Sequence, residues 1–121
     1  MLTNQQITRL LDIGYAACHT GNIDQARTIM GGVLAARPDH VTAKIGLAYS
    51  HLTVNEFDKA EELLKEVLAS HPGDPDALAY LGLNCMLAGN KQGAREALEQ
   101  IPAEAAADRP LVSSLLEQLN G

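Results

Sequence analysis

The stretch Gly21-Asn22-Ile23-Asp24-Gln25-Ala26 combines a tight turn with the start of a helix, and it recurs along the chain. The chain reads Asn55-Glu56-Phe57-Asp58-Lys59-Ala60 after 34 residues, and Gly89-Asn90-Lys91-Gln92-Gly93-Ala94 after another 34. The first position is always Gly or Asn, the residue types that enter the left-handed backbone region at least cost. A fixed period of this length predicts an array of stacked helical hairpins.

Turn and cap signals divide the chain into helices. Thr3 and Gln6 have the spacing of a capping box, and Asp39 and Asp74 are placed to cap later helices. Pro75 suits the first helical position after Asp74, where a missing N–H costs nothing. These signals predict one helix from the capping box to residue 19, and further helices over 23–37, 40–53, 57–70, 75–88, 91–100 and 109–120.

The repeat pattern stops near the C-terminus. Pro102 stands where the earlier hairpins have Leu34 and Leu68, so the sixth helix should end early. We expect a linker over 102–108 and a capping helix over 109–120, started by Asp108, as the lid of the array. The whole chain, residues 1–121, is then expected to be one domain with repeats over about 7–40, 41–74 and 75–101.

The composition favours an all-α fold with an aliphatic core. Of the 121 residues, 46% are hydrophobic, whereas only three are Tyr, one is Phe and none is Trp. Small residues recur at the helix crossings, in the columns Ala26, Ala60, Ala94 and Gly14, Ala48, Gly82. The larger core columns at the same period are Ile13, Leu47, Leu81; Met30, Leu64, Leu98; and Val33, Val67, Ile101.

The charge of the chain argues against several classes of partner. Its net charge is −6 and its pI about 5.0, which disfavours nucleic acid and anionic membrane surfaces. No apolar run is long enough to span a membrane, and the polar start lacks the regions of a signal peptide, so a cytoplasmic protein is expected. Cys18 and Cys85 lie two repeats apart, too far for a disulfide in a stacked array, so both are expected to be reduced.

No motif in the chain predicts catalysis. The four histidines and two cysteines include no C-x-x-C or H-x-x-x-H spacing, so no metal site is expected. There is also no glycine-rich phosphate loop after a strand and no G-x-S-x-G. We therefore expect a protein without cofactor or enzymatic activity.

The 34-residue helix–turn–helix unit, with small residues at its crossings and with Pro38 and Pro72 closing two hairpins, resembles the tetratricopeptide repeat. The resemblance covers about residues 5–101. Lys44 and His51 depart from it, because the other hairpins have apolar residues there, and they predict a partly wet seam around the middle repeat. The resemblance implies a curved array of three hairpins, an α-solenoid, with the first helix of each pair lining a concave groove.

The groove that the resemblance implies is mainly apolar, and an apolar strip normally marks a partner surface. Cys18 and Leu87 are both assigned to the groove, and both are equally consistent with the core. The groove has no Lys, Arg or Asn at the places where some members of the family hold a C-terminal carboxylate. The predicted groove residues are Thr8, Leu11, Tyr15, Cys18, Thr42, Ile45, Tyr49, Leu52, Ala79, Leu83 and Met86.

The partner implied is an amphipathic or apolar helical segment of a small protein client. The chain is similar to the small tetratricopeptide chaperones of bacterial type III secretion, a virulence system, which hold secreted or export-apparatus subunits. An alternative is a scaffold that bridges larger proteins in a pilus, envelope or other assembly, with a second surface near Gly31 and Gly32. Without its client, the chaperone is expected to self-associate, for example as a homodimer.

Overall fold

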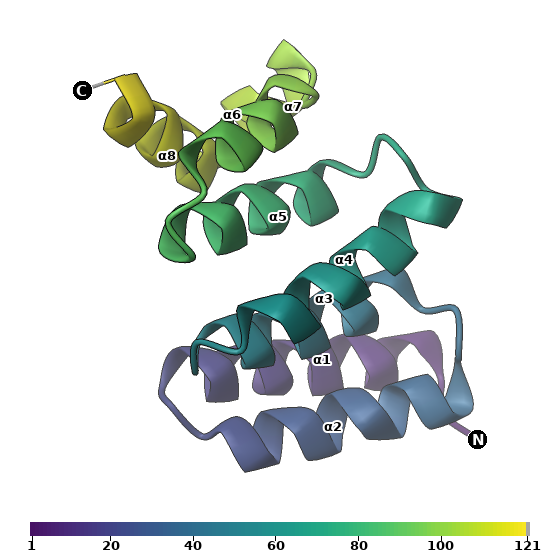
Figure 1. Cartoon of the computed structure of the whole chain (residues 1–121). Helices are drawn as coiled ribbons and strands as arrows, with labels where there is room; N and C mark the ends of the chain where they lie inside the picture. The colour runs from purple at the N-terminus through teal and green to yellow at the C-terminus, as the bar shows by residue number, and fades with distance from the viewer. Residues whose placement is uncertain (121) are drawn as a thin grey trace. The chain divides into compact units, whose positions relative to one another are not determined.

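The computed structural model describes residues 1–120, and within them all regular structure is helical, as predicted (Figure 1). The helices match the predicted ones closely except near the C-terminus. They are α1 (Asn4–His19), α2 (Ile23–Ala36), α3 (Val41–Leu52), α4 (Phe57–Ser70), α5 (Pro75–Leu87), α6 (Lys91–Glu99), α7 (Ala103–Ala107) and α8 (Pro110–Asn120).

The chain divides into two compact units, each described here by itself. Unit 1 comprises Met1–Leu63 and contains α1, α2, α3 and the first half of α4. Unit 2 begins at Leu64 and contains the second half of α4 together with α5 to α8. The boundary between the units therefore falls inside one continuous helix.

The helix starts follow the predicted cap chemistry with one exception. Thr3 caps α1, and the reciprocal hydrogen bond from the Thr3 amide to the Gln6 side chain completes the capping box. The predicted cap of α3 was wrong by one residue, because His40 and not Asp39 precedes the first helical residue. The His40 Nδ1 accepts a hydrogen bond from the Ala43 amide, with 3.3 Å between the nitrogens.

The recurring turn has the backbone that the sequence predicts. The φ angles of Gly21, Asn55 and Gly89 are 87°, 65° and 85°, all in the left-handed region. Asn55 is the one non-glycine residue with positive φ among residues 1–120. One conformational requirement therefore explains this column of the repeat.

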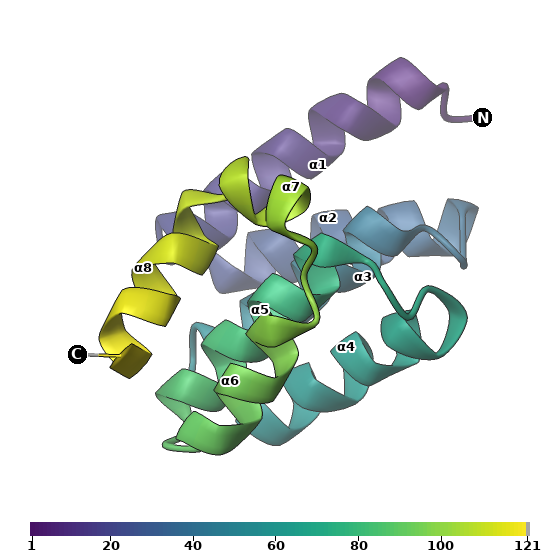
Figure 2. The same cartoon turned by 90° about the horizontal axis from the view of Figure 1, so that it is seen from above.

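In unit 1, α1 and α2 form a hairpin and α3 packs against both helices (Figure 2). Met30 is fully buried, as its core column predicts, and its side chain fills the crossing. A Cβ atom added to Gly14 or Gly46 would lie 2.6 Å or 2.5 Å from the Met30 Cε. Both glycines thus make room for one long side chain. The cluster around it contains Ile7, Leu11, Met30, Val33 and Ala43.

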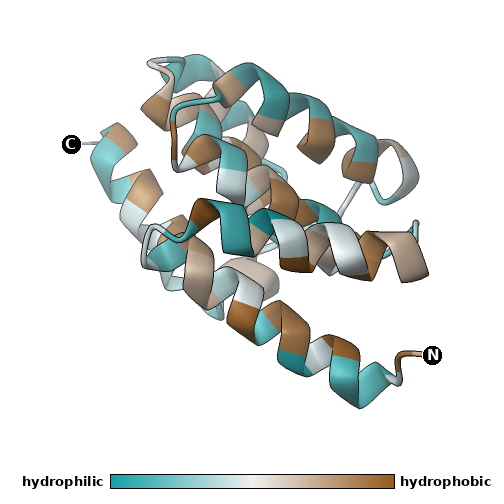
Figure 3. Cartoon of the chain, turned by 90° about the horizontal axis from the view of Figure 1, so that it is seen from below, coloured by the Kyte–Doolittle hydropathy of each residue, from teal (hydrophilic) through white to brown (hydrophobic). Residues whose placement is uncertain are grey.

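One predicted core column is wrong at its first member. Leu47 and Leu81 are half-buried, but Ile13 is 50% exposed. Leu47 packs against the core of the first hairpin, whereas α1 is the first helix of the array and has no earlier described hairpin on that side. In Figure 3, the helix that starts at the label N is α1, and hydrophobic and hydrophilic residues alternate along it.

In unit 2, α8 closes a core that it shares with α5 and α6. Val112 and Leu115 of the predicted apolar stripe are buried, and the other stripe residues pack around them. Arg95 of α6 donates a hydrogen bond to the Leu119 carbonyl, with an N···O distance of 3.2 Å. The buried residues of this cluster are Leu78, Ala79, Leu98, Ile101, Val112 and Leu115.

The predicted linker over 102–108 contains the short helix α7. Its five residues include four alanines, the best helix former, and they follow the N-cap residue Pro102. Asp108 is the C-cap of α7, so it does not start the last helix as predicted, and α8 begins at Pro110. Arg109 between the two helices donates to Asp76 Oδ1 at 2.8 Å and to the Ala105 carbonyl at 2.8 Å.

Candidate protein-binding surface

Several of the predicted groove residues are buried within the chain and therefore do not form an exposed apolar strip. Leu11 packs in the cluster around Met30, and Cys18 packs against Ala17, Ala26 and Tyr49. These side chains pack in the seam between α1 and α3. The sequence pattern does not reveal this tertiary contact, so they were predicted to lie on the surface. The buried members of the predicted set are Leu11, Cys18, Ile45, Leu52 and Ala79.

The remaining predicted residues are accessible and are distributed over both units. In unit 1, Thr8 and Thr42 are exposed, while Tyr15 and Tyr49 are half-buried. In unit 2, Leu83 and Met86 of α5 are half-buried and pack at the margin of the core cluster. The structure thus leaves a mixed polar and aromatic face on α1 and α3, and a smaller apolar face on α5.

The two tyrosines of unit 1 stack on each other across α1 and α3. Their ring centroids are 6.2 Å apart and the ring planes meet at 26°, which is within the range of favourable aromatic pairs. The predicted side-by-side position of Tyr15 and Tyr49 is therefore confirmed. The repeat period places the two residues at equivalent positions of successive hairpins.

The hydroxyl groups of the pair are anchored inside unit 1. The Tyr15 hydroxyl donates to the Thr42 carbonyl, with an O···O distance of 2.8 Å. The Tyr49 hydroxyl lies 3.5 Å from the His19 Nδ1. Burial, and secondarily the Cys18 thiol, raises the pKa of Tyr49, so this phenol stays neutral. The tyrosine pair is thus a fixed aromatic platform with neutral polar edges.

The Cys18 side chain packs against Tyr49, and its Sγ lies 3.9 Å from the Gly46 carbonyl oxygen. Burial raises the pKa of this thiol, and the nearby Arg27 charge only partly opposes the shift. The cysteines at 18 and 85 are both free thiols, as the sequence predicts, and both are buried.

We expect the cysteines to react slowly with a thiol reagent in the folded protein, because the thiolate is the reactive form and both thiols are shielded. A colorimetric thiol assay in buffer and in 6 M guanidinium chloride tests this. The rate should rise at least about tenfold on unfolding, as expected for a buried group that reacts only through an opened state. Equal rates in the two conditions would show that the thiols are accessible.

A polar cluster in unit 1 was not predicted as a set. Arg27 of α2 hydrogen bonds through Nε to the Ser50 hydroxyl at 3.2 Å, and its Nη2 contacts the carboxylate of Glu56. The His51 Nδ1 lies 2.9 Å from the same Glu56 oxygen. His51 was expected to mark a partly wet seam, and the structure places this cluster there. Glu56 occupies the repeat position that Asn22 and Asn90 hold in the other hairpins. This replacement of Asn by a charged residue was the sequence signal that could have revealed the cluster.

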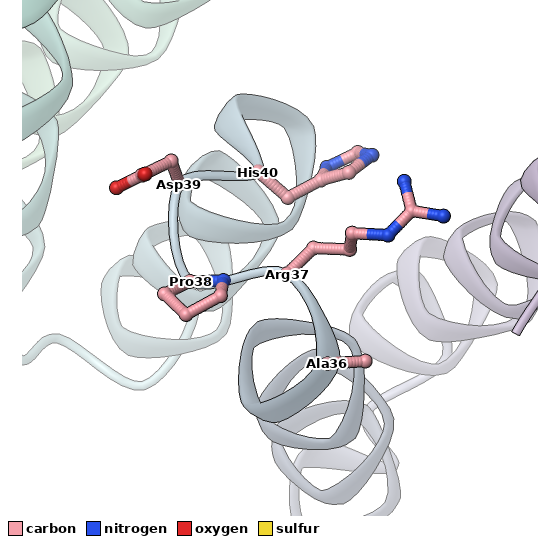
Figure 4. A pocket seen from close by; sticks show the side chains of 5 residues that line it. All are labelled: Ala36, Arg37, Pro38, Asp39 and His40. Atoms are coloured by element: carbon pink, nitrogen blue, oxygen red, sulfur yellow. The ribbon is translucent and has the colours of Figure 1, made fainter. Parts of the chain in front are cut away.

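Two hollows on the surface lie at loops, at residues 36–40 and 55–59. One of about 350 Å³ lies at the loop between α2 and α3 (Figure 4), and its lining residues are Ala36, Arg37, Pro38, Asp39 and His40. The Arg37 guanidinium donates to the Asn4 side chain at 3.2 Å and to the Leu2 carbonyl at 3.3 Å. Arg37 therefore ties the loop to the start of α1.

Residues 1–120 contain no group of three or more His, Cys, Asp or Glu side chains placed to hold a metal ion. In this part of the chain, no helix has the length and apolar character needed to cross a membrane.

Comparison with known protein families defines the class of this scaffold. The tetratricopeptide repeat model matches residues 17–70 and 52–119, so the chain belongs to the tetratricopeptide repeat family. Its helical hairpins are accordingly a protein-binding scaffold. A search of curated protein sequences found no match.

Among solved structures, the type III secretion translocator chaperone SycD of Yersinia enterocolitica superposes with a TM-score of 0.74 at 15% identity, over 99% of this chain and 87% of that one. A MamA structure has a TM-score of 0.66 at 24% identity over 97% of this chain, and MamA AMB-1 has 0.61 at 20% over 98%. This chain spans 62% and 66% of the two MamA chains. These similarities show a shared fold.

Proposed function

We propose that the protein is a chaperone or adaptor that holds an amphipathic or apolar helical segment of a small client protein. The observation that carries the proposal is the stacked pair Tyr15 and Tyr49, a rigid aromatic surface on the first helices of two successive hairpins. Anchored aromatic rings supply large contact area at low entropic cost. The exposed Thr8 and Thr42 lie on the same two helices and complete the proposed surface in unit 1.

The proposed surface of unit 2 is the accessible part of α5, which carries Leu83 and Met86. Methionine adapts to irregular apolar partners, and a half-buried leucine beside it offers a knob for a client helix. Both side chains pack against the buried cluster of unit 2, which includes Ala79. Each unit thus offers its own contact face for a client.

We further propose a type III secretion role, in which the client is a secreted or export-apparatus subunit kept soluble in the cytoplasm before export. The fold similarity to SycD, which extends over almost the whole chain, supports this role. The net charge of −6 also suits a protein that must stay soluble while it carries an apolar segment. A link to virulence would follow from the secretion role.

The substitution Thr42→Glu should weaken client binding at least about tenfold, since a client docked there would desolvate an unpaired carboxylate. Thr42 is exposed in the first turn of α3, where an acidic side chain is favourable to the helix. The fold should therefore be unaffected. Co-expression of the chain with candidate clients encoded beside it, followed by titration of the purified pair, measures the effect.

The matched control is Ala35→Glu, which adds the same charge at an exposed position on α2. It should bind the client like the wild type. The variants Tyr49→Glu and Leu83→Glu extend the test to the half-buried residues of each unit, with circular dichroism to show that they remain folded. Wild-type affinity in folded Thr42→Glu and Tyr49→Glu would refute the proposed surface of unit 1.

A scaffold that bridges larger proteins is the second candidate, and one observation favours it. Gly31 and Gly32 on α2 are exposed, and no atom lies within 4 Å of a Cβ built on either. A partner backbone could therefore approach this part of α2 closely. The mass of the purified native complex separates the candidates, because a chaperone should co-purify with one small client and a scaffold with a large assembly.

A further inference from the structure

The cluster of Arg27, Ser50, His51 and Glu56 links three consecutive elements of unit 1. Arg27 comes from α2, Ser50 and His51 from the last turn of α3, and Glu56 from the turn before α4. Ser50 is fully buried, and its hydroxyl also donates to the Leu47 carbonyl at 2.6 Å. The cluster therefore joins a buried anchor to an exposed turn.

The Glu56 carboxylate is the common acceptor of the cluster. The Arg27 Nη2 donates to Glu56 Oε1, and the His51 Nδ1 lies 2.9 Å from the same oxygen. The two nitrogens are only 3.1 Å from each other. The Glu56 carboxylate accepts from the Arg27 guanidinium and lies within hydrogen-bond distance of His51, so one negative charge brings both side chains to the turn. Without that charge, no anion would hold the two side chains there.

We propose that Arg27, His51 and Glu56 form an acid-sensitive latch that holds the α3–α4 turn against α2. Protonation of Glu56 removes the negative charge that holds both side chains at the turn. The turn should open at that step.

The pH window follows from Glu56. Hydrogen bonds from His51 and then from Arg27 lower the pKa of Glu56 below its usual value of 4.5. A carboxyl group whose pKa is lowered by folding stabilises the fold above its unfolded pKa, and this contribution is lost as the pH falls through the lowered value. Cys18 and Tyr49 adjoin the cluster, but both have raised pKa values and stay neutral in acid.

The latch also bears on the tyrosine platform, a consequence that rests on the proposed function. Tyr49 lies in the last turn of α3, directly before Ser50 and His51. Its carbonyl accepts a hydrogen bond from the Thr53 amide at 3.1 Å. Opening of the turn should loosen this part of α3 and weaken the hold on a client.

Hydrogen exchange of the turn amides tests the latch without any client. The Val54 and Glu56 amides donate to the His51 carbonyl at 3.1 Å and 3.0 Å, and the Asn55 amide donates to the Leu52 carbonyl at 3.1 Å. At pH 7, these amides should exchange at least about threefold faster in Glu56→Gln than in the wild type, a size set by the modest strength of exposed ion pairs. The wild type should show the same loss of protection below pH 4.5, after correction for the intrinsic exchange rate.

The matched control is Glu62→Gln on α4, which removes another exposed carboxylate that pairs with Lys59 at 3.8 Å. It should leave the turn amides protected and their pH dependence unchanged. Wild-type protection in Glu56→Gln at pH 7, or equal effects of the two variants, would overturn the latch. Because no client is involved, that result would leave the proposed chaperone function standing.

Discussion

Replacement of Met30 by alanine should lower the free energy of unfolding by about 2 to 5 kcal/mol, the range for removal of a large buried side chain. Met30 lies in unit 1 and is one of the largest fully buried side chains. Its Cε and Sδ occupy the space that the missing side chains of Gly14 and Gly46 leave. Alanine would leave this space empty, and the helices of the first hairpin cannot close around it without backbone movement. Urea denaturation followed by circular dichroism measures the loss.

The double variant with Gly46→Ala shows whether this packing is responsible. A Cβ at position 46 would lie 2.5 Å from the Met30 Cε and 3.2 Å from the Tyr15 ring, so Gly46→Ala alone should cost about 1 to 3 kcal/mol. In the Met30→Ala background the same methyl group enters an empty space. The loss of stability in the double variant should therefore be smaller than the sum of the losses in the two single variants. Strict additivity would mean that Met30 does not occupy this crossing.

The paired substitution Gly31→Ala and Gly32→Ala should raise the free energy of unfolding by about 1 kcal/mol per residue. Both glycines are exposed in the interior of α2, and a Cβ on either would meet no atom within 4 Å. The gain comes from the lower conformational entropy of alanine in the unfolded chain. The same urea experiment measures it.

Gly21→Ala is the matched control for this gain. Gly21 also has open space around a Cβ, but its φ of 87° lies in the left-handed region. The same substitution should therefore destabilise the protein, by roughly 1 to 2 kcal/mol. If Gly31→Ala and Gly32→Ala also destabilised it, α2 would not be a regular helix at these positions. If they stabilised the chain but abolished a native assembly, the scaffold function would gain support.

The helical array was predictable because its signals are local and repeat. The left-handed turn residue, the small residue at the crossing and the cap before Pro75 each act within a few residues. The 34-residue period made the turn residue and the small residue visible three times. The buried columns that begin at Met30 and Val33 followed from the same period. The stacking of Tyr15 on Tyr49 also followed, since equivalent positions of adjacent hairpins lie side by side.

The failures arose where the answer depends on a neighbour outside the repeat. Ile13 occupies a core column of the repeat, but no described hairpin packs beside it, and its side chain is exposed. Leu11 and Cys18 lie at the edge of a helix face, and the closeness of α1 and α3 decided their burial. The Arg27 cluster joins residues that are far apart in sequence, and the period does not link them. Periodicity therefore predicted the elements better than it predicted the surface between them.

The position of the unit boundary inside α4 has a consequence for how the chain folds and how it can be dissected. Leu63 and Leu64 are consecutive buried residues of one helix, yet they belong to different units. A fragment that ends at the unit boundary would carry only half of α4, and a helix of that length has little stability alone. Useful truncations of this protein end in its turns.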